Sequence, residues 1–204
     1  MKYTVASLNT KKAIANSLKK AMRVKPLSKI TVSEIIKDCG INRKTFYYHF
    51  EDIYALLKWM FEEEAIEVVK NFDLLVDYEE AVNFVLDYVE KNQHIINCAY
   101  DSMGRDEMKR FFYADFIELI TSIVTRAEQM NHMTLEPDFK RFVCGFYAEG
   151  LAGILILYIK SKDHYTREEI VNYISAVLRL GITAILTESQ NALSFETMPH
   201  CPRF

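Results

Sequence analysis

Residues 30–50 of this 204-residue chain read ITVSEIIKDCGINRKTFYYHF, and they carry the start and stop signals of two short helices. Thr31 and Glu34 have the spacing of a capping box, in which each side chain accepts a hydrogen bond from the other residue's backbone N–H group. Gly40 can adopt the left-handed conformation that ends a helix, and Asn42 can cap the next one. The pattern predicts two helices joined by a tight turn, the arrangement of a helix-turn-helix.

The second of these helices, from residue 43 to residue 49 or 50, is expected to present a polar and aromatic outer surface. At ~100° per residue, Phe46 and Phe50 turn toward the core while the other residues point outward or to the flanks. These outer side chains are Arg43, Lys44, Thr45, Tyr47 and Tyr48. They offer donors for phosphate oxygens and base edges, and rings for thymine methyl groups. A merely solvated helix is the alternative, but it would rarely expose two tyrosines without use.

The charge of the chain is unevenly divided along its length. Residues 1–60 hold twelve Lys or Arg and four Asp or Glu, whereas the remaining residues hold thirteen and twenty-four. A basic N-terminal part on an acidic body is typical of a nucleic-acid-binding protein whose body has another role. Chance segregation of solvated charge is the alternative, and the outer surface of the helix at residues 43–49 weighs against it.

Composition and periodicity indicate an all-α fold. The chain holds only six glycines and four prolines, too few for the turns that a β-sandwich or barrel needs every ~8–12 residues. A first helix is expected from a Thr10 cap to about Val24, and a second capping box, Thr166 with Glu169, is expected to open the last helix. The apolar periodicity places the other helices at residues 52–71, 79–92, 94–102, 106–130, 136–161 and 166–188. The predicted organisation is a three-helix helix-turn-helix domain over residues 1–50, a larger helical body over residues 51–190 and a flexible tail over residues 191–204.

No catalytic or metal-binding pattern accompanies these helices. The sequence has no GxSxG, HExxH or GxxxxGKS/T motif, and its four cysteines (residues 39, 98, 144 and 201) lack the spacing of a zinc site. We therefore expect no enzyme activity, no metal and no cofactor. The longest apolar run, Leu151–Ile159, is far shorter than the ~18 residues of a membrane span. The N-terminus lacks a signal-peptide core, so a cytoplasmic protein without a membrane partner is expected.

Residues 30–36 and 40–50 together resemble the DNA-binding signature of the tetracycline-repressor (TetR) family, which covers about residues 10–60 here. The amino-acid sequence of residues 43–50 is similar to that of the branch of the family that includes regulators of dihydroxyacetone-kinase operons. The resemblance implies an all-helical protein whose first three helices bind double-stranded DNA. It also implies a larger and more variable helical body that forms a homodimer and usually binds an inducer.

The resemblance assigns roles to seven side chains. Base edges or nearby phosphates would be met by Arg43, Lys44, Thr45 and Tyr48. The sugar-phosphate backbone would be held by Tyr47 and His49, and a further phosphate by Thr31. One position departs from the family, because Ile53 stands where a lysine is common. That phosphate contact is therefore not implied here, and Asp52 beside it cannot replace a lysine.

The last two helices are expected to form the dimer surface. A helix-turn-helix monomer makes few contacts, and a dimer gains specificity by reading two half-sites about 34–36 Å apart in a palindrome. Leu155 and Leu178 are expected to lie on this surface. The helix at residues 136–161 also contains the small residues Ala148, Gly150, Ala152 and Gly153. Packing within the chain and contact with a second copy are both open explanations for each of them.

Three functions remain open at this point. The first is a homodimeric transcriptional regulator that binds a palindromic operator and is controlled by a small-molecule effector in its body. The second is a co-activator or adaptor of the same fold whose body binds a partner protein. The third is an enzyme or carrier built on a helical bundle. The aromatic residues of the body exceed what sealing short helices requires, which favours an apolar effector cavity, with Leu57 as part of the lever that connects it to the DNA-binding domain.

Overall fold

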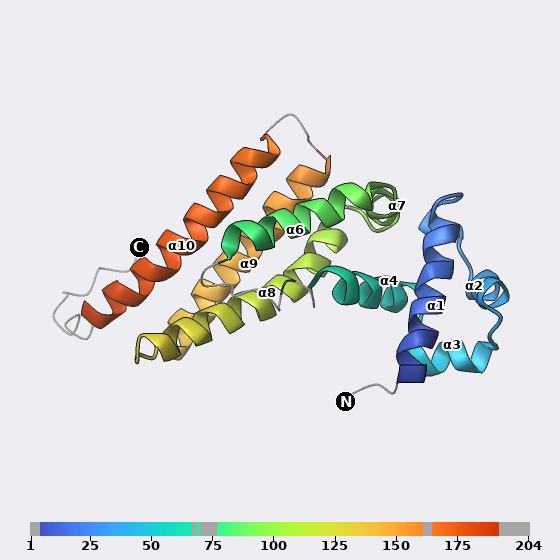
Figure 1. Cartoon of the computed structure of the whole chain (residues 1–204), viewed down its shortest axis with the longest axis horizontal. Coiled ribbons are helices and arrows are strands. Elements are labelled where there is room, and N and C mark those ends of the chain that lie inside the picture. Colours follow the sequence, from blue (N-terminus) through green and yellow to red (C-terminus); the bar gives the residue numbers. More distant parts are fainter. Residues whose placement is uncertain (1–4, 67–68, 70–76, 161–164, 192–204) are drawn as a thin grey trace, which may run out of the picture.

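The computed structural model describes residues 5–66, 69, 77–160 and 165–191, and every regular element within these ranges is helical. The first four elements form a small head, at the blue end of the chain in Figure 1. They are α1 (Val5–Met22), the 3-10 turn η1 (Leu27–Lys29), α2 (Val32–Cys39) and α3 (Arg43–His49). Ile14, Leu18, Ile35 and Phe46 pack at its centre and are almost completely buried.

The local signals of the head form as the sequence predicts. Glu34 N donates to Thr31 Oγ1 over 3.3 Å, and Thr31 N donates to Glu34 Oε2 over 2.9 Å, which closes the capping box of α2. Gly40 ends α2 in the left-handed conformation, with φ of 68°. Thr45 N donates to Asn42 Oδ1 over 2.8 Å, so Asn42 caps α3. These three features fix the angle between α2 and α3 with interactions that span only a few residues.

One predicted boundary is wrong, and one predicted helix contains a π-helical turn. Helix α1 begins at Val5, and Thr10 lies inside it, where its hydroxyl donates to the carbonyl of Ala6 over 2.9 Å. A threonine inside a helix can satisfy its hydroxyl in this way, so it need not cap. The single helix predicted over residues 52–71 is instead α4 (Ile53–Phe61), capped by Asp52, followed by a π-helical turn, η2 (Glu62–Ile66). Residues 67, 68, 70 and 71 lie outside the described residues.

The body is a bundle of long helices. It contains α6 (Tyr78–Lys91), α7 (Gln93–Met103), α8 (Arg105–Met130), α9 (Pro137–Lys160) and α10 (Arg167–Asn191). Helices α8 and α9 form the most extensive pair, while α10 packs mainly on α6. The predicted Thr166–Glu169 capping box opens α10, with Glu169 N donating to Thr166 Oγ1 over 3.2 Å. The tail expected over residues 191–204 lies outside the described residues except for Asn191, which ends α10.

Two elements connect the head to the body. Helix α4 leaves the head toward α8, and α7 packs against both α1 and η1 (Figure 1). The π-helical turn at the end of α4 adds ion pairs to α1, which are described below. The head is therefore held to the body along one side, by α4, η2 and α7 together.

Helix α9 is long and apolar enough to cross a membrane by length and composition alone. In the structure, however, 44% of its most apolar 18-residue window is buried inside the bundle. The central helix of a helical bundle has the same length and composition, because it is apolar on more than one side. The apolar character of α9 is thus accounted for by its packing against α8 and by the exposed face described below.

Candidate nucleic-acid interface

Helix α3 has one side anchored in the head and one side exposed. Phe46 is completely buried, and its ring centroid lies 6.0 Å from that of Phe50. The Phe50 ring centroid in turn lies 5.6 Å from that of Trp59 on α4. On the opposite side, 81% of the Tyr48 surface is exposed. The helix therefore turns its inner and outer residues as its sequence predicts.

The two cations of α3 lie on this outer side. The guanidinium of Arg43 stacks over the Tyr47 ring, 5.6 Å from its centroid, and its Nη2 donates to the Tyr47 hydroxyl over 3.3 Å. Residues four apart on a helix are neighbours, so this pair positions both side chains before any ligand arrives. Lys44 is exposed beside them. Thr45 is half-buried, and its hydroxyl donates to Asn42 Oδ1 over 3.1 Å.

His49 and Thr31 lie in less favourable surroundings for an anion. Burial, followed by the charge of Lys11, lowers the pKa of His49 below its usual 6.5, so the imidazole is neutral near pH 7. It can meet a phosphate as a hydrogen-bond donor but not as a cation. Thr31 is exposed, but its hydroxyl donates to Glu34 over 3.0 Å. A phosphate at Thr31 would therefore lie next to a carboxylate, and Thr31 is the least suited of the seven predicted residues.

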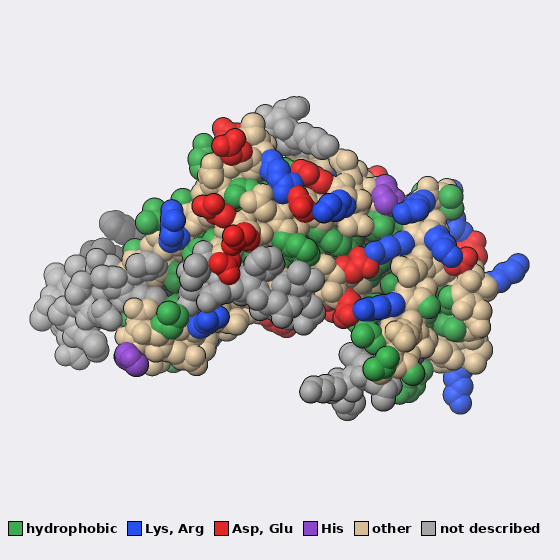
Figure 2. Space-filling model, viewed as in Figure 1, with side chains coloured by type: hydrophobic (Ala, Val, Ile, Leu, Met, Phe, Trp, Pro, Cys, Tyr) green, Lys and Arg blue, Asp and Glu red, His purple; other side chains and the backbone are tan. Residues whose placement is uncertain are grey.

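Much of the positive charge of the head is paired within the chain. Figure 2 shows Lys and Arg side chains concentrated over the head. Lys20 lies 3.1 Å from Asp38, Lys12 lies 3.7 Å from Glu63, and Lys19 and Lys25 pair with Glu64 and Glu34. By contrast, Arg43 and Lys44 make no ion pair with any described residue. The charge count of the sequence cannot separate these two groups, because pairing depends on the folded arrangement.

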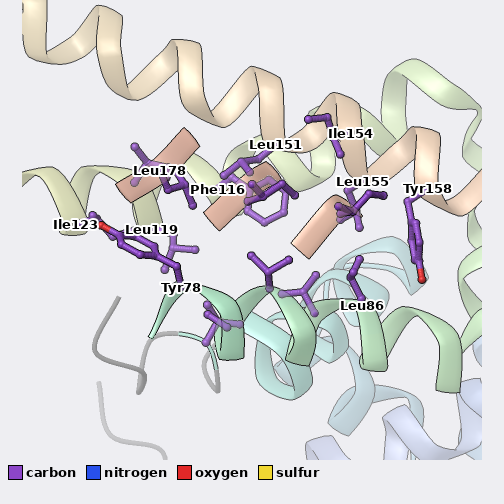
Figure 3. A pocket seen from close by; sticks show the side chains of 17 residues that line it. Tyr78, Leu86, Phe116, Leu119, Ile123, Leu151, Ile154, Leu155, Tyr158 and Leu178 are labelled. Carbon is purple, nitrogen blue, oxygen red and sulfur yellow. The ribbon is translucent and has the colours of Figure 1, made fainter. Parts of the chain in front are cut away.

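The body contains a small apolar cavity between α6, α8, α9 and α10. Its volume is about 70 Å³. Figure 3 shows apolar side chains from all four helices pointing toward one another around it, with Tyr78 and Tyr158 at opposite ends. Phe116, one of the aromatic residues of the body from which such a cavity was expected, lines it. Tyr78 and Tyr158 were missed, because no sequence pattern distinguishes an aromatic ring at a cavity wall from one in a packed core.

The outer sides of α9 and α10 are unusually apolar. Phe142 and Phe146 are 68% and 66% exposed, and their rings stack with centroids 6.4 Å apart. A Cβ atom added at Gly150 or Gly153 would meet no atom within 4 Å. On α10, more than half of the surface of each of three apolar residues is exposed: Tyr173, Val177 and Leu180. We call these seven residues the α9–α10 outer face.

The contact between Tyr147 and Gly181 places the two halves of this face side by side. A Cβ atom added at Gly181 would lie only 1.9 Å from the Tyr147 hydroxyl oxygen, so the hydroxyl fills the space next to this glycine. Phe146 and Leu180 are the sequence neighbours of this contacting pair. Exposed apolar side chains of both helices therefore lie close to this contact.

The structure corrects the residues predicted for the dimer surface. Leu155 and Leu178 are only 7% and 6% exposed, and both line the apolar cavity. Helix α9 is apolar around most of its circumference, so its periodicity does not show which side faces solvent. The small residues divide in the same way, since Ala148 and Ala152 are completely buried. Gly150 and Gly153 lie on the α9–α10 outer face.

Together, the anchored head with its exposed recognition helix and the separate helical body define a helix-turn-helix DNA-binding protein. Residues 19–60 match the family model described as bacterial regulatory proteins, tetR family. Residues 77–180, about half of the chain, match the model described as transcriptional regulator C-terminal region, TetR_C_8. The chain belongs to the TetR family of transcriptional regulators, and these matches are to regulators rather than to enzymes.

Two relatives indicate the branch. The chain is 24% identical over 148 residues to the HTH-type dhaKLM operon transcriptional activator DhaS of Lactococcus lactis subsp. lactis (strain IL1403), covering 72% of this chain and 78% of the relative. It is also similar in fold to a solved structure of the dihydroxyacetone kinase operon activator DhaS. That similarity has a TM-score of 0.64 and 23% identity, and it covers 86% of this chain and 97% of the other. The family and the DhaS-like branch inferred from the sequence are thus confirmed.

Proposed function

We propose that this chain is a homodimeric regulator that binds a palindromic operator through the outer side of α3 and is controlled through its body. The DNA-binding domain would be residues 1–50, and the body residues 51–190. One observation carries the proposal: α3 is anchored by Phe46 and Phe50 and turns toward solvent two cations, Arg43 and Lys44, that pair with no described carboxylate. A helix in this setting can enter a major groove with its cations at its N-terminal end.

The experiment compares variants on DNA selected from a randomised duplex pool by the wild-type protein. Lys44→Ala should weaken binding and reduce the slope of log K against log salt by about 0.9 for each phosphate that is no longer neutralised. Lys20→Ala is the matched control, because it removes the same charge from a lysine that is paired with Asp38. Arg43→Ala should also relax base preference, since a bidentate contact to guanine provides about 1–3 kcal/mol of discrimination. Unchanged affinity in Arg43→Ala, Lys44→Ala and Tyr47→Ala at matched salt would contradict the proposal.

The homodimer would form through the α9–α10 outer face. Isolated monomers rarely expose a contiguous apolar patch of this kind without a partner, and the glycines at 150 and 153 would let a second helix approach closely. Leu180→Glu should therefore yield a monomer in sedimentation at micromolar concentration and lose operator affinity. Ser122→Glu, on the exposed side of α8, is the control and should remain dimeric. A wild-type chain that sediments as a monomer would refute this part.

The input would be a small molecule bound in the body. The supporting observation is the apolar cavity among α6, α8, α9 and α10. Taken alone, the size of this cavity supports the alternative, a partner protein, because about 70 Å³ is roughly half of a cavity that holds benzene. A thermal-shift screen against a metabolite panel separates the two, since a ligand at about 100 times its Kd stabilises by roughly 2.7 kcal/mol. A panel without any hit would favour the partner protein.

A further inference from the structure

Tyr158 lies at the boundary between two hollows of the body. On one side it lines the apolar cavity of about 70 Å³. On the other side it lines an open hollow of about 240 Å³ at the surface, where the end of α9 meets the start of α10 and the end of α6. Figure 3 shows its ring standing at one end of the cavity. The Tyr158 side chain is therefore shared by two hollows, one wholly apolar and one whose mainly apolar lining also contains Glu90, Thr166 and Arg167.

A polar network holds the Tyr158 side chain in place. The Tyr158 hydroxyl donates to Glu90 Oε1, while Glu90 Oε2 accepts from Arg167 Nη1 over 2.9 Å. Arg167 Nη2 in turn donates to Asp87 Oδ1 over 2.5 Å and to Asn83 Oδ1 over 3.1 Å. Burial, followed by the hydrogen bond to Glu90, raises the pKa of Tyr158 to about 12, so the hydroxyl keeps its proton near neutral pH. The closed position thus rests on one hydrogen bond between a donor and a charged acceptor.

Rotation of Tyr158 would join the two hollows. Their combined size reaches the lower end of the ~300–1,000 Å³ that is usual for small-molecule sites. The joined site would have an apolar inner part and, at its outer end, the Glu90 oxygen that Tyr158 had occupied. An anionic end of a ligand is disfavoured there, because it would meet the Glu90 carboxylate directly, and Arg167, the cation paired with Glu90, is shared with Asp87, which also pairs with Lys91.

We infer that the body binds a small, mainly hydrocarbon molecule with a single hydroxyl, of which a phenol is the closest match, and that this hydroxyl replaces that of Tyr158 on Glu90. The inference rests on the proposed role of the body as the effector-binding part. It deepens that role by naming the class of ligand and the residue that admits it. The ligand would push the Tyr158 ring aside, fill the cavity with its apolar part and donate to Glu90.

Three probes of similar size test the chemistry. The phenol 4-ethylphenol has both the hydrocarbon part and the hydroxyl donor. The ether 4-ethylanisole has a similar hydrocarbon part without a donor, and 4-ethylbenzoate is an anion. The phenol should raise the melting temperature of the wild-type protein in a dose-dependent way, whereas the ether and the anion should not. Equal shifts with the phenol and the ether would overturn the assignment of Glu90 as the recognising group. No shift with any of the three would overturn the site.

Two variants test the role of Tyr158. Tyr158→Phe keeps the ring but removes the hydroxyl that competes for Glu90, so 4-ethylphenol should bind about tenfold more tightly in calorimetry, the low end for a hydrogen bond to a charged group. Tyr113→Phe on α8 is the matched control, because Tyr113 does not line either hollow, and it should leave binding unchanged. Unchanged affinity in Tyr158→Phe would overturn the gating role. Operator binding measured without probe on the same samples shows separately whether the proposed DNA function holds.

Discussion

The tightest contact between α9 and α10 offers a sharp test of how the body is assembled. At Gly181 an added Cβ atom would lie 1.9 Å from the Tyr147 hydroxyl oxygen and 3.2 Å from Cζ of the same ring. Tyr147 is only 8% exposed, so moving its hydroxyl means shifting a ring that is packed in the core. Gly181→Ala should therefore force the two helices apart or displace the ring, and overpacking of this kind costs about 1–3 kcal/mol.

Replacing a glycine by alanine inside a helix also stabilises the helix, which offsets part of the cost of the clash. The stability of Gly181→Ala must therefore be compared with that of another glycine-to-alanine variant. Alanine is favoured over glycine inside a helix by about 1 kcal/mol. At Gly145 on α9 a Cβ atom would meet only the Tyr113 hydroxyl, at an ordinary 3.7 Å. Gly145→Ala should accordingly be stabilising, and the difference between the two variants isolates the clash. For a chain of this length, about 2–4 °C per kcal/mol converts that difference to roughly 2–12 °C in Tm.

The assay is thermal unfolding followed by circular dichroism at one fixed protomer concentration, because the Tm of a dimer depends on concentration. The double variant Tyr147→Phe with Gly181→Ala should recover most of the stability, since the nearest remaining ring atom is Cζ at 3.2 Å. Tyr147→Phe alone, with the wild type, Gly181→Ala and the double variant, completes a double-mutant cycle. If Gly181→Ala melts at the same temperature as Gly145→Ala, or if Tyr147→Phe does not rescue it, the described packing of α9 on α10 is wrong.

Three further predictions concern the junction, the head and the dimer face. Glu64 accepts hydrogen bonds from Lys19 of α1 and, over 3.0 Å, from Tyr88 of α6, so Glu64→Gln should speed amide hydrogen exchange in α1. Glu63→Gln is the control and should have a smaller effect, because the only ion pair of Glu63 among the described residues is to Lys12 at 3.7 Å. Equal exchange rates in the two variants would exclude Glu64 as the main link between head and body. The pKa of Glu34 is lowered to about 2, first by the hydrogen bond from Lys25, so its contribution to stability is present above pH ~4.5 and is lost as pH falls toward 2. The Tm advantage of the wild type over Glu34→Gln should vanish across that interval, and an advantage that persists at pH 2 would contradict the assignment. Gly150→Ala should weaken the dimer in sedimentation although its Cβ meets nothing within the protomer; an equally stable dimer would mean that no second helix packs there.

The parts of the fold that could be predicted from the sequence depend on interactions within a few residues. The capping boxes at Thr31 and Thr166, the left-handed Gly40 and the Asn42 cap are all of this kind. The orientation of α3 followed from two phenylalanines four residues apart. Thr10 shows the limit of such signals, because a threonine at the right spacing can equally bond back to the preceding turn from inside a helix.

The parts that could not be predicted depend on which sides of a helix the other helices cover. Leu155 and Leu178 were expected on the dimer surface, yet both line the cavity, whereas Leu180 of the same helix as Leu178 is exposed. Leu57, which was expected to be part of the lever between body and head, is completely buried, and its coupling role stays a prediction. Its truncation to alanine would cost about 2–5 kcal/mol and unsettle the whole head. Glu64 is the better probe of coupling, because it is partly exposed and bridges both parts.

The charge asymmetry of the chain acts within the protein as well as toward DNA. Lys12 and Lys19 pair with Glu63 and Glu64 of the π-helical turn, so part of the attraction between basic head and acidic body is used to hold the two together. Five cations of the head make no ion pair with any described residue: Arg23, Lys29, Lys37, Arg43 and Lys44. If all five met phosphates in both protomers, the slope of log K against log salt would reach about −9, at roughly 0.9 for each phosphate. The twelve cations counted from the sequence would give more than twice that value. A measured slope well beyond −9 would therefore mean that DNA binding recruits further cations, and a slope that returns toward −9 in Lys12→Ala and Lys19→Ala, but not in Lys20→Ala, would make the ion pairs between head and body part of the regulatory equilibrium.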